Sequence, residues 1–132
     1  MVIAQINENM PRTHGDGFIN MNDIDFAVSY NELLLEYSVK APSDIVQRIG
    51  RYVSRIIEDN STIQVGYSII PDAVVSRLSE KKHLGVHTEL LSDGVVDLMR
   101  KGVVDNTKKS FNPGKTIAAF CMGSKETYDL PR

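Results

Sequence analysis

From Ser43 to the end of the chain, the sequence alternates between helix and strand patterns, and this alternation limits the fold more than any other feature. Apolar residues first recur every three or four positions, which is typical of an amphipathic helix: Ile45, Ile49, Val53, Ile56 and Ile57. Ser43 can cap the first turn, and Asp44 suits the positive end of the helix dipole. The pattern predicts a helix that ends near Asp59-Asn60.

Short apolar runs and further helix patterns then follow one another. We expect strands over residues 63–65, 84–88 and 116–122, the last of them buried and containing Cys121 as a small hydrophobic residue. We expect the intervening helices to begin at Pro71, to run from Ser92-Asp93 to Gly102, and to begin again after Gly123. Lys81-Lys82-His83 marks the end of the first of these three. This order indicates βαβ units and a mainly parallel sheet, so the fold class is α/β.

The first 42 residues carry weaker patterns. Residues 2–6 form a short β-branched run that predicts a buried strand, and the loop PRTHGDG follows at residues 11–17. Residues 18–30 predict two short strands joined by a turn, and residues 31–42 an extended connection. We therefore expect one domain over residues 1–132, in which residues 1–42 connect to an α/β core at 43–132.

Composition excludes several classes of partner. The chain has 132 residues, enough for one domain with a real core, and its 15 basic and 17 acidic residues give a net charge of −2. Such a balance offers no field for phosphate backbones or anionic membranes, so we expect no nucleic acid and no membrane partner. The N-terminus lacks the features of a signal peptide, and no apolar run approaches membrane-spanning length, which predicts a cytoplasmic protein.

The stretch GVHTELLSD, residues 85–93, is the strongest candidate site. Glu89 is predicted where a strand passes into a helix start, and the carboxyl ends of strands in α/β sheets face the ligand crevice. Its apolar neighbours predict partial burial, and a buried carboxylate must be paired, protonated or functional. The alternative is a carboxylate that is simply stabilised by the helix dipole. Since Gly66 also follows a strand and precedes a helix, we expect it beside Glu89, with glycine allowing an unusual backbone angle.

Three other chemistries fit less well. His83, His87, Glu89 and Asp93 lack a known metal-ligand spacing, so we expect no metal, and His87 is more readily a hydrogen-bonding partner of its neighbours. Gly66-Tyr67-Ser68 begins a serine-hydrolase elbow, but Ile70 replaces the second glycine. The end of a P-loop motif at residues 114–116 precedes a strand instead of a helix.

Several longer stretches identify a resemblance that covers nearly the whole chain. They are MPRTHGDGFI and NDID near the N-terminus, then STIQVGYSIIPDAV, KKHLGVHTELLSDGVVDL, GVVDN and PGKTIAAFCMGSKETYD. These stretches resemble the acetyl-CoA hydrolase/transferase family, and within it the 4-hydroxybutyrate and butyryl CoA-transferases. The resemblance implies open α/β/α layers of the CoA-transferase type, shared with ribose-phosphate isomerase-like proteins.

The same resemblance implies an activity. Glu89 would be the nucleophile that attacks an acyl-CoA, and a glutamyl-CoA thioester would then transfer CoA to a carboxylic acid in ping-pong fashion. The partners would be acyl-CoA and short-chain carboxylates, with coenzyme A as a substrate and no permanently bound cofactor. Gln64 and Gly66 match the family's Q-x-G motif and would bind substrate or support the oxyanion, together with Ser68 and His87.

Two departures from the family pattern change these expectations. Ser68 stands where relatives usually have a second glycine, and Ile69 replaces a small residue, which would alter thioester approach or acyl-chain preference. Family members are also much longer, so we expect part of a transferase that lacks one wall of the cleft and a CoA-contacting segment, self-associates as a homo-oligomer, and is inactive alone. Acyl-CoA hydrolysis and a non-catalytic domain are the alternatives.

Overall fold

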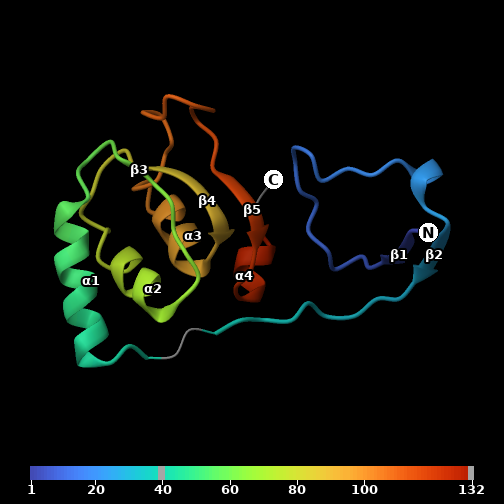
Figure 1. Cartoon of the computed structure of the whole chain (residues 1–132), viewed down its shortest axis with the longest axis horizontal. Helices are drawn as coiled ribbons and strands as arrows, with labels where there is room; N and C mark the ends of the chain where they lie inside the picture. The colour runs from blue at the N-terminus through green and yellow to red at the C-terminus, as the bar shows by residue number, and fades with distance from the viewer. Residues whose placement is uncertain (39–40, 131–132) are drawn as a thin grey trace.

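The computed structural model describes residues 1–38 and 41–130, and its strands form two separate sheets. Figure 1 shows the two-stranded sheet, β1 and β2, standing apart from the helices, while the three-stranded sheet, β3 to β5, lies among them. A long extended stretch of chain connects these parts.

The larger sheet has the order β3-β4-β5, and both of its strand pairs are parallel. Thr62 pairs with Gly85 across β3 and β4, and His87 pairs with Ile117 across β4 and β5. The strands are β3 (Thr62–Ile63), β4 (Gly85–Leu91) and β5 (Ile117–Cys121), and the helices are α1 (Asp44–Ile56), α2 (Ile69–Val75), α3 (Asp93–Arg100) and α4 (Lys125–Tyr128). Helices alternate with parallel strands, which confirms the predicted α/β class.

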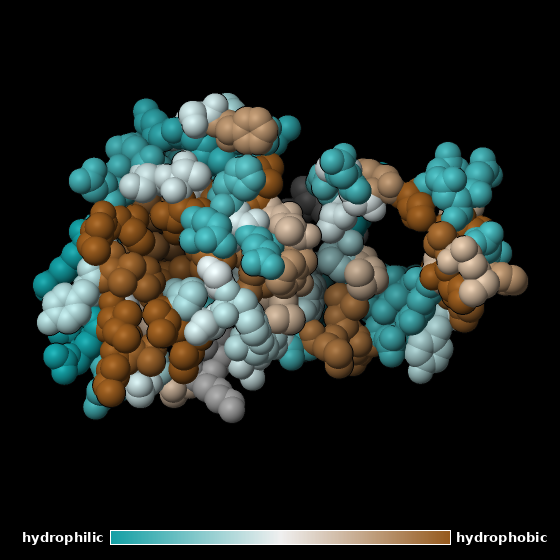
Figure 2. Space-filling model, viewed as in Figure 1, coloured by the Kyte–Doolittle hydropathy of each residue, from teal (hydrophilic) through white to brown (hydrophobic). Residues whose placement is uncertain are grey.

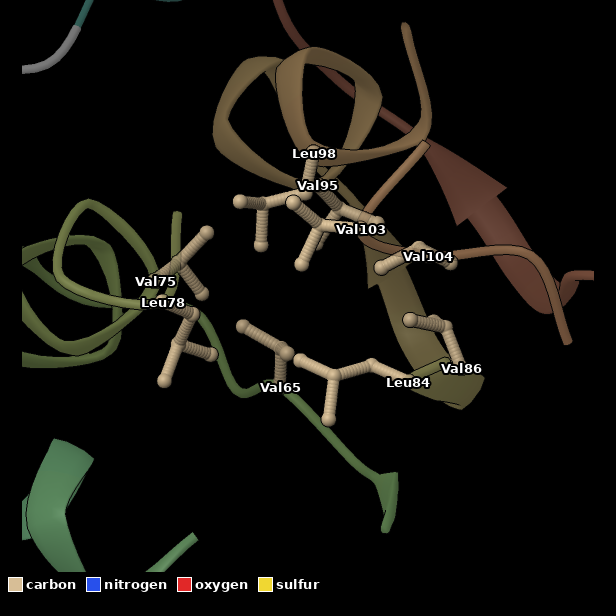
Figure 3. Close-up of a cluster of buried hydrophobic side chains, with 9 residues drawn as sticks. All are labelled: Val65, Val75, Leu78, Leu84, Val86, Val95, Leu98, Val103 and Val104. Atoms are coloured by element: carbon tan, nitrogen blue, oxygen red, sulfur yellow. The ribbon is translucent and has the colours of Figure 1, made fainter. Parts of the chain in front are cut away.

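The hydrophobic core lies on one face of this sheet. Side chains of a strand alternate between its two faces, and in β4 the buried set is Val86, Thr88 and Leu90, while His87 and Glu89 are exposed. Figure 3 shows the core cluster between β4 and the helices α2 and α3: Val65, Val75, Leu78, Leu84, Val86, Val95, Leu98, Val103 and Val104. The other face of β4 therefore presents its polar side chains.

Helix α1 starts as predicted but ends early. The Ser43 Oγ accepts a hydrogen bond from the Val46 N–H at 3.4 Å, which confirms the cap. The helix stops at Ile56 because the residues beyond it bind elsewhere: Asp59 accepts from the Lys82 N–H at 2.9 Å, and Asn60 donates to the Lys82 carbonyl at 3.0 Å. The predicted end near Asp59-Asn60 was therefore wrong.

Helix α2 is shifted toward the N-terminus of the chain relative to the prediction. Ser68 caps it, so Pro71 occupies its third position instead of its first, where the missing N–H is still harmless. The helix ends at Val75, well before residues 81–83, and short-range turns at Arg77 and Leu78 replace the expected continuation. Helix α3 ends as predicted, since Gly102 adopts a positive φ of 72° just past it.

Strands β4 and β5 also differ from expectation. Strand β4 continues to Leu91, so Glu89 lies inside the strand and not at the strand-to-helix junction that the sequence predicted. Strand β5 was predicted to be buried, but residues 118–120 are exposed because β5 forms an edge of the sheet. Cys121, at its end, is half-buried, and this burial raises the pKa of its thiol.

The N-terminal ribbon, residues 1–32, carries the smaller sheet. Strand β1 (Ile3–Ile6) pairs in parallel with β2 (Phe26–Ser29), and a 3-10 turn, η1 (Met21–Asp23), lies between them. Asn20 caps η1 by accepting from the Asn22 N–H at 3.0 Å, so a turn replaces the first of the two predicted strands. The predicted burial of residues 2–6 was wrong, because no described residue before residue 39 is buried.

The extended connection predicted for residues 31–42 is confirmed over 31–38 and 41–42; residues 39–40 lie outside the described residues. Its backbone docks on the corner between β5 and α4. The Tyr37 N–H donates to the Gly123 carbonyl at 3.0 Å, the Lys125 N–H donates to Glu36 Oε2 at 3.0 Å, and the Tyr128 hydroxyl donates to the Leu35 carbonyl at 2.9 Å. In the described part of the chain, no helix is long and apolar enough to cross a bilayer.

Candidate active site

Glu89 lies on the exposed face of β4, two residues beyond His87 on the same face. The prediction of partial burial was wrong for a physical reason. The apolar neighbours of Glu89 point the other way, because Thr88 and Leu90 belong to the buried face of a strand with a period of two. Glu89 is therefore an accessible carboxylate on a rigid strand.

Gln64 and Gly66 follow the end of β3, the strand next to β4. The pairing of the two strands ends at Ile63 and Val86, and the chain then leaves the ladder. The buried Thr88 side chain holds this arrangement: its Oγ1 accepts from the Val65 N–H at 2.9 Å and donates to the Val65 carbonyl at 2.7 Å. Gly66 and Glu89 therefore each follow one of two residues in contact, but Gly66 lies three residues beyond β3 and Glu89 lies inside β4, so they do not occupy neighbouring strand ends as expected.

Gly66 does not have the unusual backbone angle that the sequence suggested. Its φ is outside the left-handed region, where Gly15, Gly102 and Gly114 lie. A Cβ at Gly66 would meet only Pro71 Cγ, at an ordinary 3.9 Å. The fold of this segment thus does not require glycine at this position.

Ser68 is exposed and caps helix α2, since its Oγ accepts from the Ile70 N–H at 3.4 Å. Its backbone is extended, a conformation that any residue adopts, so a serine is accommodated there without strain. Ser68 follows Gly66 by two residues, so the cap also fixes the start of α2 next to the candidate site.

His83 and Asp93 make hydrogen bonds outside the candidate site. His83 Nδ1 is 2.6 Å from Asp105 Oδ2, and Asp93 Oδ1 accepts from the Ser124 N–H at 2.8 Å and from the Ser124 and Thr127 hydroxyls. Asp93 therefore fixes the start of α4. Hydrogen bonds from the Thr107 backbone and from His83 lower the pKa of Asp105 to about 2. The structure does not gather these side chains with His87 and Glu89.

Aromatic residues that the sequence analysis did not single out flank the candidate site. The Phe111 ring stacks on His87 with centroids 6.0 Å apart and an interplanar angle of 14°. The Tyr67 ring contacts Tyr37 with centroids 5.2 Å apart, and the neighbouring Tyr67 side chain raises the pKa of Tyr37. Phe111 lies in a polar turn with no periodicity, so only the fold reveals its position.

An apolar groove of about 400 Å³ begins beside Gln64 and Gly66. It runs between α1, the open edge of β3 and α2, where Figure 2 shows a hydrophobic area on the surface. Its apolar lining comprises Val53, Ile57, Ile63, Val65, Ile70, Pro71, Val74, Val75 and Leu78. The candidate site thus combines the exposed carboxylate of Glu89 and the imidazole of His87 on one face of β4 with the exposed amide of Gln64 just past the end of β3, groups suited to nucleophilic attack and hydrogen-bond donation.

Comparisons with known proteins agree on one class of enzyme, although no family model matches. The chain is 46% identical over 130 residues to 4-hydroxybutyrate coenzyme A transferase of Clostridium kluyveri, covering 98% of this chain and 30% of the relative. It is 41% identical over 129 residues to succinyl-CoA:cyclohexane-1-carboxylate CoA transferase of Geobacter metallireducens, with coverages of 98% and 30%. The crystal structure of 4-hydroxybutyrate CoA-transferase from Porphyromonas gingivalis superposes with a TM-score of 0.91 and 37% identity, covering 97% of this chain and 33% of that one.

These relatives confirm the resemblance seen in the sequence and the CoA-transferase type of the fold. The chain spans about 30% of the length of the curated relatives it matches. Nearly every residue of the chain aligns with them, so the resemblance is not confined to the candidate site. The chain is therefore homologous, over almost its whole length, to one segment of the CoA-transferases.

Proposed function

We propose that this chain is the nucleophile-bearing part of a CoA-transferase that moves CoA between a short-chain acyl-CoA (acetyl, butyryl or 4-hydroxybutyryl) and a carboxylic acid. The observation that carries the proposal is the exposed Glu89 on β4, with Gln64 and Gly66 in the segment that follows the neighbouring strand β3 and is bound to Thr88 through Val65. The relatives named as CoA transferases support the same class of reaction. On this proposal CoA is a substrate, not a resident cofactor.

The reaction has two symmetric halves. The Glu89 carboxylate attacks the thioester carbonyl, the C–S bond breaks, and a mixed anhydride and CoA thiolate form. The thiolate then attacks the glutamyl carbonyl, so that the acyl group leaves as a carboxylate and a glutamyl-CoA thioester remains. A second carboxylate reverses these steps. A carboxylate nucleophile suits this exchange because the acyl acceptor is itself a carboxylate.

Each attack passes through a tetrahedral intermediate whose oxyanion needs hydrogen-bond donors. The Gln64 amide, the Gly66 backbone N–H and the His87 imidazole are the proposed donors. Their support is positional: Gln64 and Gly66 follow the end of β3, His87 and Glu89 lie on the adjacent parallel strand β4, and Gln64, His87 and Glu89 are exposed. Ser68 contributes by capping α2 and, through the position of its hydroxyl, by limiting how the substrate enters.

Acyl-CoA hydrolysis is the second candidate. Glu89 is open to solvent in the described residues, and water that reaches the glutamyl thioester releases CoA without an acceptor acid. A protein wall that excludes water would favour transfer.

The division into a connecting segment at 1–42 and a core at 43–132, and the homo-oligomeric state, stay predictions.

The test uses the complete polypeptide that contains this segment, incubated with acetyl-CoA and no acceptor acid. Hydroxylamine or borohydride should trap a glutamyl-CoA thioester at Glu89, detected by peptide mass spectrometry. Glu89→Gln keeps the size of the side chain but removes the nucleophilic oxygen, so the adduct should disappear while CoA binding remains. Glu89→Asp should also be impaired, because the carboxylate retracts by about 1 Å and loses its attack geometry.

Two results would count against the proposal. An adduct on Asp72 or Asp93 would reassign the nucleophile, and an active enzyme with no adduct would remove covalent catalysis. Rapid CoA release that does not depend on an acceptor acid would favour the hydrolase. Full transferase turnover by residues 1–132 alone would contradict the expectation that substrate positioning requires the rest of a transferase.

A further inference from the structure

We propose that Phe111 is a positioning residue that holds the His87 imidazole on the Glu89 face, and that residues 106–116, called here the Asn106 loop, exist to present it. The function given to His87 rests on the proposed function above.

The base of the Asn106 loop binds both backbone polar groups of Val86, the residue immediately before His87. Asn106 is buried, and its Oδ1 accepts from the Val86 N–H at 2.9 Å. Lys109 is only 6% exposed, and its Nζ donates to the Val86 carbonyl at 2.8 Å and to the Lys115 carbonyl at 2.6 Å. The loop is therefore fixed to β4 one residue from the candidate site.

These side chains take the place of a neighbouring strand. Pairing between β4 and β5 begins only at His87 and Ile117, so Val86 has no strand partner on that side. A lysine is costly to bury, and burial lowers the pKa of Lys109, so its two carbonyl acceptors are needed to keep it there. The fit is close: a Cβ at Gly85 would lie 2.4 Å from Lys109 Cγ.

The rest of the loop is closed on itself. The Gly114 N–H donates to the Asn106 carbonyl at 2.8 Å, and the Lys115 N–H donates to the Asn112 carbonyl at 3.2 Å. Asn106 Nδ2 also donates to Thr116 Oγ1 at 2.9 Å, which joins the two ends of the loop. A closed loop with a fixed base gives Phe111, near its tip, a defined position.

Phe111 contacts His87 but is itself 65% exposed, so burial of its own ring does not explain its position. The consequence of the stack lies with His87, whose ring loses rotational freedom against a parallel aromatic face. His87 and Glu89 are two residues apart on one strand, hence about 7 Å apart along it. An imidazole already confined on that face requires no ordering when the thioester arrives.

The first experiment measures how fast diethyl pyrocarbonate modifies each histidine of the 132-residue chain, by peptide mass spectrometry, with the exposed His14 as the internal reference. Phe111→Ala should raise the rate at His87 severalfold, and Phe111→Trp should restore protection. Phe120→Ala, which removes an exposed aromatic ring from β5, is the matched control and should change nothing. Equal His87 rates in the wild type and Phe111→Ala would overturn the proposal.

A second pair of variants tests the base of the loop. Lys109→Met should free His87 as Phe111→Ala does, whereas Lys108→Met, at an exposed neighbour, should not. Protection that survives Lys109→Met would show that the loop does not need this anchor and would contradict its assigned role. The Phe111 series remains decisive if Lys109→Met fails to fold.

The last arm measures turnover by the complete polypeptide. Phe111→Ala should lower kcat severalfold with KM unchanged, and Phe111→Trp should recover it. A His87 that becomes reactive without any loss of kcat would overturn the positioning role. Failure to trap an adduct at Glu89 would instead overturn the proposed function, and the His87 modification rates would still decide whether Phe111 holds the ring.

Discussion

The N-terminal ribbon and the α/β core are both built on parallel strands, yet only the core has an interior. In the ribbon, Ile3 is 62% exposed and Phe26 is 59% exposed, whereas Val86 of β4 is fully buried. The core strands are joined through helices that pack on the sheet, but β1 and β2 are joined through loops and the short turn η1. Parallel strands become stable when crossover helices cover them, and the ribbon has none.

Polar contacts hold the ribbon together instead. The Val2 N–H donates to Asp25 Oδ2 at 2.6 Å, and Gln5 Nε2 donates to Glu32 Oε1 at 2.9 Å. Solvent competes for exposed hydrogen bonds, so each contributes only about 1 kcal/mol net. We therefore expect the ribbon to be less stable than the core, although both have a regular strand register.

The largest difference should appear in amide hydrogen exchange. Amides of β4 should exchange only when the core unfolds, which costs about 5 kcal/mol or more in an ordinary domain, whereas amides of β2 should open at almost no cost. Leu90 and Val28 are suitable reporters, since one is buried and the other is exposed. Equal protection factors measured by NMR would mean that the ribbon is as stable as the core.

A matched pair of substitutions should separate the regions in urea unfolding. Val86→Ala removes two buried carbons and leaves a cavity, so it should cost about 2 to 3 kcal/mol. Val28→Ala removes the same atoms from an exposed side chain and should stay within about 0.5 kcal/mol. A cost at Val28 as large as that at Val86 would contradict the comparison.

Helix caps should show a smaller contrast. Ser43→Ala removes the α1 cap and should lower the free energy of unfolding by about 1 kcal/mol. Asn20→Ala removes the η1 cap in the ribbon and should leave core unfolding unchanged, as followed by circular dichroism at 222 nm. A midpoint shift of the same size in both variants would show that the two regions unfold together.

The smallest expected effect is a pH dependence confined to the core. The Asp105 pKa falls from 3.8 to about 2 in the folded chain, so its contribution to stability is present above pH 4 and is lost as the pH falls toward 2. Asp105→Asn should reduce the pH dependence of thermal stability between pH 4 and pH 2, while Asp16→Asn, in the exposed N-terminal loop, should leave it unchanged. An unchanged slope for Asp105→Asn would argue against its hydrogen bonds with Thr107 and His83.

The predictions from the sequence were most accurate for elements whose local pattern agreed with the packing of the core. Residues around Ser43 and Gly102 formed the expected helix ends, because caps and a positive φ act within a few residues. The buried strand at residues 2–6 was wrong because burial depends on a covering layer that periodicity does not encode. Glu89 was predicted just past the strand that in fact contains it, and its exposure required knowing which face of β4 meets the helices.

The features that the sequence did not predict depend on contacts between residues far apart in the chain. Phe111 reaches His87 through a loop whose base depends on Asn106 and Lys109, residues that look like ordinary polar positions in the sequence. A buried lysine with two carbonyl acceptors has no periodic signature. Such contacts can be identified only once the arrangement of the strands is known.

Thr88 has a consequence for how the exposed face is built. Strand β3 contains only two residues, too few to define its own alignment with β4, and one hydroxyl on the buried side both accepts from and donates to Val65. That hydroxyl fixes the position of Val65 against β4. Serine would keep the hydroxyl, whereas valine would remove it with little change in side-chain volume. The segment that carries Gln64 and Gly66 is therefore attached to the strand that carries Glu89 from the buried side, by a side chain on the opposite face of β4 from that carboxylate.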